Sequence, residues 1–384
     1  MKRIFVVLAL FAYVGAFGMS LDDTSSNRNH SIMIAVERKD INAVKRLIGS
    51  FYDNNTIIDL LSVRANKRSW SKEALQQYLD PILKRIRDIL NERNRKGDTP
   101  LIFAIREDSQ NLAEYLVDQG ADVNLAGERG DTPVLIATKN NNFRLVKYLV
   151  QHGANVDRPN NYGYVPLTIA LEHDKEVIAK YLIDNGADVN HRRGANDTPL
   201  ITAIRNENED LAKYLIDYNA NVNKTGEYKD TPLTVATKNN FENLVKYLVD
   251  NGAYVNIPNG YGYTPLTIAV ESDSEAVAKY LVDNGADVNH RRGVDDTPLI
   301  TAIKNGNESL AKYLVERGAN INKKGENGNT PVLVAVEEHN KILTKYLVER
   351  GADIHMPNCF GRTAQTIAED SEYNAIIEIL QNVE

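Results

Sequence analysis

Residues 197–223 read DTPLITAIRNENEDLAKYLIDYNANVN, and the order of residue types in this stretch indicates the fold. Thr198 can cap a helix through its side-chain oxygen, and Pro199 suits the first turn, where a missing N–H costs nothing. A second apolar segment follows with the spacing of one buried helix face, at Leu211, Ala212, Leu215 and Ile216. Asn219 stands where that helix should end in a left-handed conformation, which glycine and then asparagine adopt most easily. The stretch therefore predicts two short helices that pack together and end in a turn.

The same pattern recurs every 33 residues along the chain. The Thr-Pro pair is found at Thr99-Pro100, Thr132-Pro133, Thr198-Pro199, Thr231-Pro232, Thr264-Pro265, Thr297-Pro298 and Thr330-Pro331, and Val165-Pro166 and Thr363-Ala364 occupy the remaining positions. Five residues later stands an alanine, at Ala104, Ala137, Ala170, Ala203, Ala236, Ala269, Ala302, Ala335 and Ala368. The sequence Gly-Ala-Asp-Val-Asn closes units at Gly120–Asn124, Gly186–Asn190 and Gly285–Asn289. A period of this length is typical of stacked repeat architectures.

These features resemble the ankyrin repeat family, over residues 91–384 and in about nine units. The resemblance implies an all-α fold, an ankyrin-repeat solenoid of stacked helix pairs with projecting β-turns, and a role as a binding scaffold. One departure is consistent, because the histidine that often follows Thr-Pro-Leu in the family is absent. Its place is taken by Ile102, Leu135, Thr168, Ile201, Thr234, Thr267, Ile300 and Leu333. We therefore expect other contacts to fix the first turn of each first helix.

The N-terminus has the three-part layout of a secretory signal peptide. Lys2 and Arg3 precede an uncharged, mostly apolar run from Ile4 to Phe17, and Gly18 follows. The run is shorter than the roughly 20 residues that a membrane-spanning helix needs. The sequence therefore predicts a signal peptide over residues 1–18 and a periplasmic or secreted protein. An uncleaved N-terminal anchor is the alternative.

Two further segments precede the regular array. Residues 30–49 resemble a degenerate first repeat, and residues 50–90 are expected to form an irregular helical segment. Between Arg64 and Lys96 there are 10 basic and 4 acidic residues, a net charge of +6 in a chain of net charge −7. The interpretation is a solvated basic cap, and contact with an acidic or anionic-lipid surface is the alternative.

A second period of 99 residues sorts the projecting turns into three kinds. One kind is basic, one is mixed in charge, as from Glu227 to Asp230, and one is aromatic. Arginine and tyrosine often dominate protein interfaces, so their presence on turn tips predicts a partner-binding surface. The predicted binding residues are Arg192, Arg193, Arg291, Arg292, Tyr162, Tyr164, Tyr261 and Tyr263. Recent duplication without selection for binding would produce the same period and stays open as the alternative.

A tyrosine also recurs every 33 residues on the second helix, from Tyr115 to Tyr346. At about 100° per residue, Tyr214 lies about 130° from the centre of the apolar stripe, at its edge. This position suits a ring that is buried while its hydroxyl contacts water. The tyrosine ladder is therefore predicted to be structural.

The sequence holds no pattern that indicates catalysis or a cofactor. The single cysteine, Cys359, excludes an internal disulfide, and no activating base stands near it. His191 and His290 lie on separate turns and are not expected to share a metal. The negative net charge argues against nucleic acid as the main partner.

The predicted function is therefore a non-enzymatic scaffold outside the cytoplasm that binds an unidentified protein through its turn tips and concave face. A host-directed effector secreted by a bacterium is the alternative within the same binding mode. A third hypothesis is an enzyme with active residues between Ser50 and Leu90. That segment contains no recognisable set of catalytic residues, which argues against the hypothesis. We expect a monomer without cofactor or metal and without a membrane span once the signal is removed.

Overall fold

The computed structural model describes residues 34–49, 80, 84, 87–194, 196–293 and 295–382. Within these ranges the chain forms helices and turns and no strand. The predicted signal peptide and most of the basic segment lie outside the described residues. The chain divides into two compact units, Met1–Asp188 and Val189–Glu384, which are described separately.

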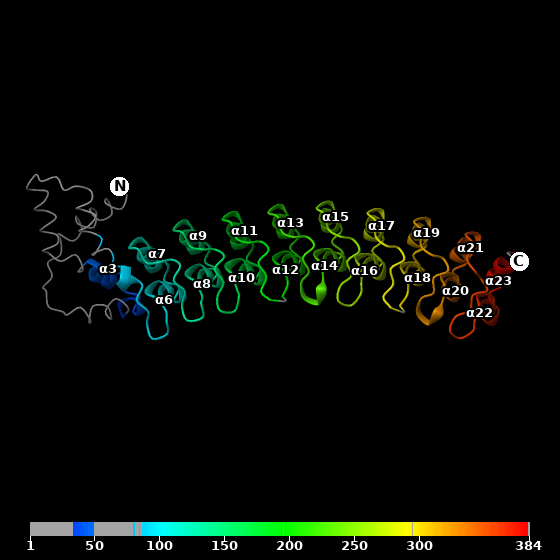
Figure 1. The fold of residues 1–384 in the computed structure, drawn as a ribbon, viewed down its shortest axis with the longest axis horizontal. Helices are drawn as coiled ribbons and strands as arrows, with labels where there is room; N and C mark the ends of the chain where they lie inside the picture. Colours follow the sequence, from blue (N-terminus) through cyan, green and yellow to red (C-terminus); the bar gives the residue numbers. More distant parts are fainter. Residues whose placement is uncertain are drawn as a thin grey trace, which may run out of the picture. The chain divides into compact units, whose positions relative to one another are not determined.

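The described part of unit 1 starts with a short helical stretch at residues 34–37, followed by α3 (Ile41–Gly49), where the degenerate repeat is predicted. Its regular repeats each contain a first helix of seven residues and a second helix of nine (Figure 1). The first helices are α6 (Pro100–Arg106), α8 (Pro133–Lys139) and α10 (Pro166–Glu172). The second helices are α7 (Gln110–Asp118), α9 (Phe143–Gln151) and α11 (Glu176–Asp184).

Unit 2 repeats the same pairing. Its first helices are α12 (Pro199–Arg205), α14 (Pro232–Lys238), α16 (Pro265–Glu271), α18 (Pro298–Lys304), α20 (Pro331–Glu337) and α22 (Ala364–Asp370). Its second helices are α13 (Glu209–Asp217), α15 (Glu242–Asp250), α17 (Glu275–Asp283), α19 (Glu308–Glu316), α21 (Lys341–Glu349) and α23 (Asn374–Gln381). Two turns contain a short 3₁₀ segment, η1 (Glu227–Lys229) and η2 (Glu326–Gly328).

The helix starts and ends follow from the residues that the sequence repeats. In α12 the Thr198 hydroxyl oxygen accepts a hydrogen bond from the Ile201 N–H at 3.3 Å, and Pro199 takes the first helical position. The second helices end at residues with positive φ, such as Gly186 at 86°. Asn219 adopts the same conformation at 67°, which confirms its predicted role.

The missing family histidine is replaced in two ways. Where threonine stands at that position, it completes a capping box: in α16 the Thr264 N–H donates to the Thr267 hydroxyl at 2.9 Å. Where an aliphatic residue stands there, it packs into the core, and Ile201 and Ile300 are both fully buried. The expectation that other contacts fix this turn is therefore confirmed.

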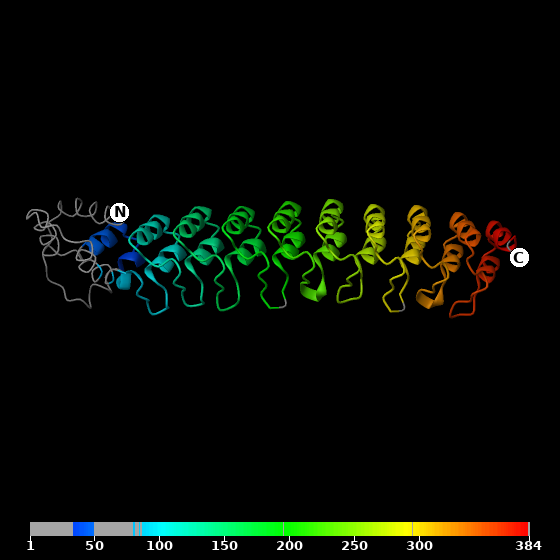
Figure 2. The same ribbon diagram turned by 45° about the horizontal axis from the view of Figure 1, so that its top comes forward.

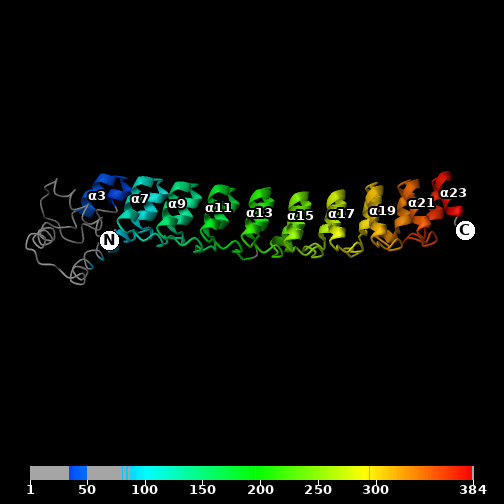
Figure 3. The ribbon, with the colours of Figure 1, turned by 90° about the horizontal axis from the view of Figure 1, so that it is seen from above.

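Successive repeats stack helix on helix within each unit. First helices contact first helices and second helices contact second helices, as α14 contacts α16 and α15 contacts α17 in unit 2. Figure 2 shows the turns projecting on the side of the first helices, and Figure 3 shows the second helices of consecutive repeats side by side. The repeated alanines, such as Ala236 and Ala269, are inaccessible to solvent, because the helices approach closely there.

Side chains in the turns also connect one repeat to the next. The side-chain oxygen of Asn256 accepts a hydrogen bond from the Asp287 N–H at 2.8 Å, and its side-chain amide donates to the Gly285 backbone carbonyl at 2.9 Å. Asn124 makes the same two bonds in unit 1, to the Asn155 N–H and the Gly153 carbonyl. The frequent asparagines and aspartates therefore serve the turns.

Candidate protein-interaction surface

The aromatic turn of unit 2 is organised by one asparagine. The Asn259 side-chain oxygen accepts from the N–H groups of Tyr261 and Tyr263 at 3.0 and 3.1 Å. Its amide donates to Asp230 on the preceding turn at 3.1 Å. Asn160 does the same for Tyr162 and Tyr164 in unit 1. The turn backbone is thus fixed by asparagine, and the tyrosine side chains are left to other contacts.

The two tyrosines of this turn differ in exposure. The Tyr261 side chain is 56% exposed and stacks on Tyr228 of the preceding turn, with ring centroids 5.7 Å apart. Tyr162, its counterpart in unit 1, is 58% exposed. Tyr263 is half-buried and lies under the guanidinium of Arg292, 4.4 Å from the ring centroid. Tyr164 is likewise half-buried.

The arginines of the basic turns make contacts within the protein. Arg292 donates through Nε to the Asp295 carboxylate, and Arg291 donates to the carbonyl of Lys324 on the next turn. Arg192 donates through Nε to the Asn196 carbonyl at 2.6 Å. Arg193 is half-buried. The predicted binding arginines therefore also make contacts within their own turns, and their role toward a partner stays a prediction.

Tyr228 was not singled out by the sequence, although it is 61% exposed. Its φ is 53°, and the next residue, Lys229, has φ 57°, so two consecutive side-chain-bearing residues are left-handed. Such a backbone costs of order 1–3 kcal/mol per residue and is often found where a protein binds something. At the corresponding position 99 residues later, Asn327 and Gly328 adopt the same conformation without the bulky side chain. That comparison was available in the sequence and marks Tyr228 as unusual.

The first-helix face beside these turns carries a row of charged residues. Arg205 pairs with Asp197 at 2.6 Å and with Asp230 at 2.9 Å, and Lys304 pairs with Asp296 at 2.6 Å. Glu271 stands at the corresponding position of α16, and no hydrogen bond or ion pair joins it to another described residue. The sequence analysis missed this residue, although the exchange of a basic residue for an acidic one is visible there.

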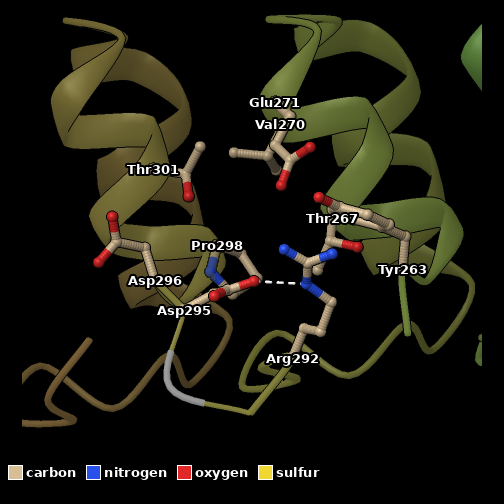
Figure 4. Close-up of a pocket in the computed structure, with 9 residues that line it drawn as sticks. All are labelled: Tyr263, Thr267, Val270, Glu271, Arg292, Asp295, Asp296, Pro298 and Thr301. Carbon is tan, nitrogen blue, oxygen red and sulfur yellow. Dashed lines mark hydrogen bonds and ion pairs between the residues drawn. The ribbon is translucent and has the colours of Figure 1, made fainter. Parts of the chain in front are cut away.

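Glu271 lies at a cleft of unit 2 (Figure 4). The cleft is lined by the end of α16, the start of α18 and the turn that carries Arg292 and Asp295. Arg292 lies between Tyr263 and Asp295, with Glu271 above it (Figure 4). Partial burial of its carboxyl group raises the pKa of Glu271, and the positive charge of the nearby Arg292 opposes this shift. The site therefore combines an arginine that is already bonded with a carboxylate that is not.

The tyrosine ladder is structural, as predicted. Tyr280 is half-buried, and its hydroxyl donates to Asp250 of the preceding repeat at 3.0 Å. Tyr247 and Tyr313 bond in the same way to Asp217 and Asp283. Burial and the Asp250 carboxylate raise the pKa of Tyr280. These hydroxyls hold neighbouring second helices together, so they are not offered to a ligand.

The described ranges show no sign of a metal site or of a membrane span. These residues contain no cluster of three or more histidine, cysteine or acidic side chains suited to a metal ion. None of the helices described there combines the length and the apolar character needed to cross a membrane. His290 bonds to the Gly262 carbonyl at 3.0 Å and is part of the turn.

Comparison with known proteins identifies the repeat. A family model described as ankyrin repeats in three copies matches residues 32–127, 125–193, 191–259, 255–325 and 290–358. Among solved structures, the chain is similar to the crystal structure of the ankyrin repeat domain of Bcl-3, described as a unique member of the IkappaB protein family. The identity is 24%, the TM-score is 0.49, and the match covers 57% of this chain and 99% of that chain. No curated protein matches.

Proposed function

This chain belongs to the ankyrin repeat family, whose repeats are in general a non-enzymatic scaffold for protein–protein interaction, and we propose that it binds its protein partner through the turn tips and the adjoining first-helix face outside the cytoplasm. The exposed aromatic tips support this surface most directly. Tyr162 and Tyr261 are both more than half exposed, and nothing in a turn requires a ring there. Tyrosine is also a residue on which interface energy often concentrates.

The arginines extend the same surface. Arg192, Arg193, Arg291 and Arg292 lie on the neighbouring tips, and an arginine held in one geometry by its own turn loses less conformational entropy when it binds a partner. Their contacts within the turns are therefore compatible with a second role toward a partner.

The test uses a partner obtained by pull-down with the chain lacking residues 1–18. We expect Tyr162→Ser and Tyr261→Ser together to weaken the measured affinity for that partner by about 2 kcal/mol, because interface tyrosines commonly contribute this much. Ile342→Ser is the matched control, since Ile342 is 54% exposed on a second helix. An affinity that the tyrosine variant leaves equal to that of the parent would refute the assignment of the tips.

Export is a separate part of the proposal, supported by the layout of Lys2 to Gly18 in the sequence. The chain should be recovered outside the cytoplasm with its mass reduced by cleavage near Gly18 or Ser20. Cell fractionation followed by intact-mass measurement tests this. Cytoplasmic protein that retains Met1 would contradict export and leave the binding surface untouched.

A further inference from the structure

One tip position carries an exposed aromatic ring each time the period of 99 residues recurs. Tyr162 in unit 1 is 58% exposed, and Tyr261 and Phe360 in unit 2 are 56% and 72% exposed. Phe360 was not among the predicted binding residues, although the period places it at the position of Tyr261. The turn before α22 therefore presents a third ring of the same kind.

The folded turn does not require this ring. The Asn358 side-chain oxygen accepts hydrogen bonds from the N–H groups of Phe360 and Arg362 at 2.9 and 3.1 Å, as Asn259 does in the turn before α16. The backbone of the turn is therefore fixed by asparagine. The Phe360 ring itself makes no ring–ring or cation–π contact with another described residue.

The residues around the ring have changed while the ring has been kept. The residue before it is Asn161, Gly260 or Cys359, and the second residue after it is Tyr164, Tyr263 or Arg362. A single exposed ring is ordinary on a protein surface. Its presence at one position of three turns whose neighbouring residues differ favours a role for the ring over inheritance by duplication alone.

The feature that recurs is the ring and not the hydroxyl. Phe360 has no hydroxyl, and no hydrogen bond joins the Tyr261 hydroxyl to another described residue. A contact that depended on a hydroxyl could not be made at Phe360. What the three turns share is a flat apolar surface, which is stabilised when it leaves water for an apolar environment.

The second aromatic position of the turn behaves differently. Tyr263 is half-buried beneath the guanidinium of Arg292, which lies 4.4 Å from the ring centroid. At the same position before α22 stands Arg362, which pairs with Asp370 at 3.1 Å. This position therefore holds a side chain that makes contacts inside unit 2, and it is not restricted to aromatic residues.

We infer that the tip position of Tyr162, Tyr261 and Phe360 places an aromatic ring in an apolar depression on the surface of the protein partner, and that Phe360 is a binding residue. The depression would be lined by aliphatic or aromatic side chains, as the cores of protein interfaces are. The tyrosine hydroxyl stays at its rim in contact with water. This inference rests on the proposed function, and it names the chemistry by which that surface is recognised.

The test measures the affinity of the full chain for the purified protein that the pull-down recovers, by surface plasmon resonance. Phe360→Ser and Tyr261→Ser should each weaken binding about fivefold, because loss of an interface ring commonly has at least that effect. Phe360→Tyr and Tyr261→Phe keep the ring and should bind within about twofold of the parent. Tyr254→Ser is the matched control: Tyr254 is 64% exposed, but neighbouring repeats have Asn221 and Asp287 at its position, so its removal should leave the affinity unchanged.

Three results would overturn the inference: parental affinity in Phe360→Ser, equal losses in Tyr261→Phe and Tyr261→Ser, or a loss in Tyr254→Ser as large as that in Phe360→Ser. Thermal unfolding of each variant shows whether the fold is retained. Parental affinity in Phe360→Ser together with weakened binding by the variant that lacks Tyr162 and Tyr261 would refute the role of Phe360 and leave the tip surface standing. If no recovered protein binds the parent, the proposed function and this inference fail together.

Discussion

Substitution of Asp157 by asparagine should stabilise unit 1. Asp157 accepts a hydrogen bond from the Asp188 N–H at 2.8 Å, as asparagine does at the corresponding positions of other repeats. A carboxylate cannot donate, however, so the bond that Asn124 makes to the Gly153 carbonyl at 3.0 Å has no counterpart from Asp157 to Gly186. Asp157→Asn keeps the acceptor and supplies the missing donor in a side chain of nearly the same shape.

The expected gain follows from one added hydrogen bond. A net contribution of about 0.5–1.5 kcal/mol is typical, and the exposed position favours the lower half of that range. A gain of about 1 kcal/mol would raise the melting temperature by roughly 1 °C if the whole chain of 384 residues unfolds together, because the unfolding entropy grows with chain length. Urea unfolding of the full chain measures the stability, and hydrogen exchange of the turn around Gly186 shows whether the gain is local.

Asn124→Asp is the matched reverse change in the same unit, and it should lose about as much as Asp157→Asn gains. The reasoning is refuted if Asn124→Asp is destabilising while Asp157→Asn leaves stability unchanged. That pair of results would mean that water satisfies the Gly186 carbonyl as well as an amide does.

Three further outcomes are expected in unit 2. Thr264→Ala should cost about 1 kcal/mol in urea unfolding, because the Thr267 N–H at the start of α16 loses its cap. Tyr280→Phe should cost about 1 kcal/mol through loss of the bond to Asp250. The raised pKa of Tyr280 favours the protonated form in the folded state, so the stability that this hydroxyl contributes is complete below about pH 10 and declines above it. The raised pKa of Glu271 predicts that the parent loses some stability as pH rises above about 4.3, and pH-dependent melting of Glu271→Gln should lack that decrease.

Each of these outcomes has a control variant or a result that would contradict it. Tyr346→Phe should cost less than Tyr280→Phe, because the Tyr346 hydroxyl has only a 3.4 Å contact with the Lys312 carbonyl. Equal losses in the two variants would show that the carboxylate bond adds nothing. Thr264→Ser should retain most of the stability that Thr264→Ala loses, and the same melting curve for both would contradict the capping argument. A pH profile of Glu271→Gln that matches the parent would mean that Glu271 is fully solvated.

Much of the fold could be predicted because its determinants lie within one repeat. Thr198, Pro199 and Asn219 act on backbone groups a few residues away, and the repetition of their pattern made each assignment firm. The tyrosine ladder could be placed from angles on a single helix, although its aspartate partners in the preceding repeat were not foreseen.

The candidate surface was harder to predict because its contacts join residues about 30 positions apart. Whether Arg292 extends to solvent or stacks on Tyr263 depends on how closely consecutive turns approach, which the sequence does not state. Glu271 has no hydrogen bond because Arg292 bonds to Asp295 and not to Glu271, and the sequence does not show which of these two carboxylates Arg292 contacts. Site residues on repeat proteins are therefore best sought where one repeat departs from the pattern of its neighbours.

The hydrogen bonds of the aromatic turn also affect the deamidation of one of its asparagines. An asparagine followed by glycine tends to lose ammonia when the glycine nitrogen attacks the side-chain amide, and Asn259-Gly260 is such a pair. In the folded turn the Gly260 N–H donates to the Tyr228 carbonyl at 2.5 Å and the Asn259 amide donates to Asp230, so neither group is free to react. Unfolding would release both, and the carboxylate formed would then face Asp230 on refolding, where two like charges repel. Folding therefore protects Asn259 from deamidation. A molecule that stays unfolded for long enough would refold with an aspartate in place of Asn259, and its aromatic turn would be less well ordered.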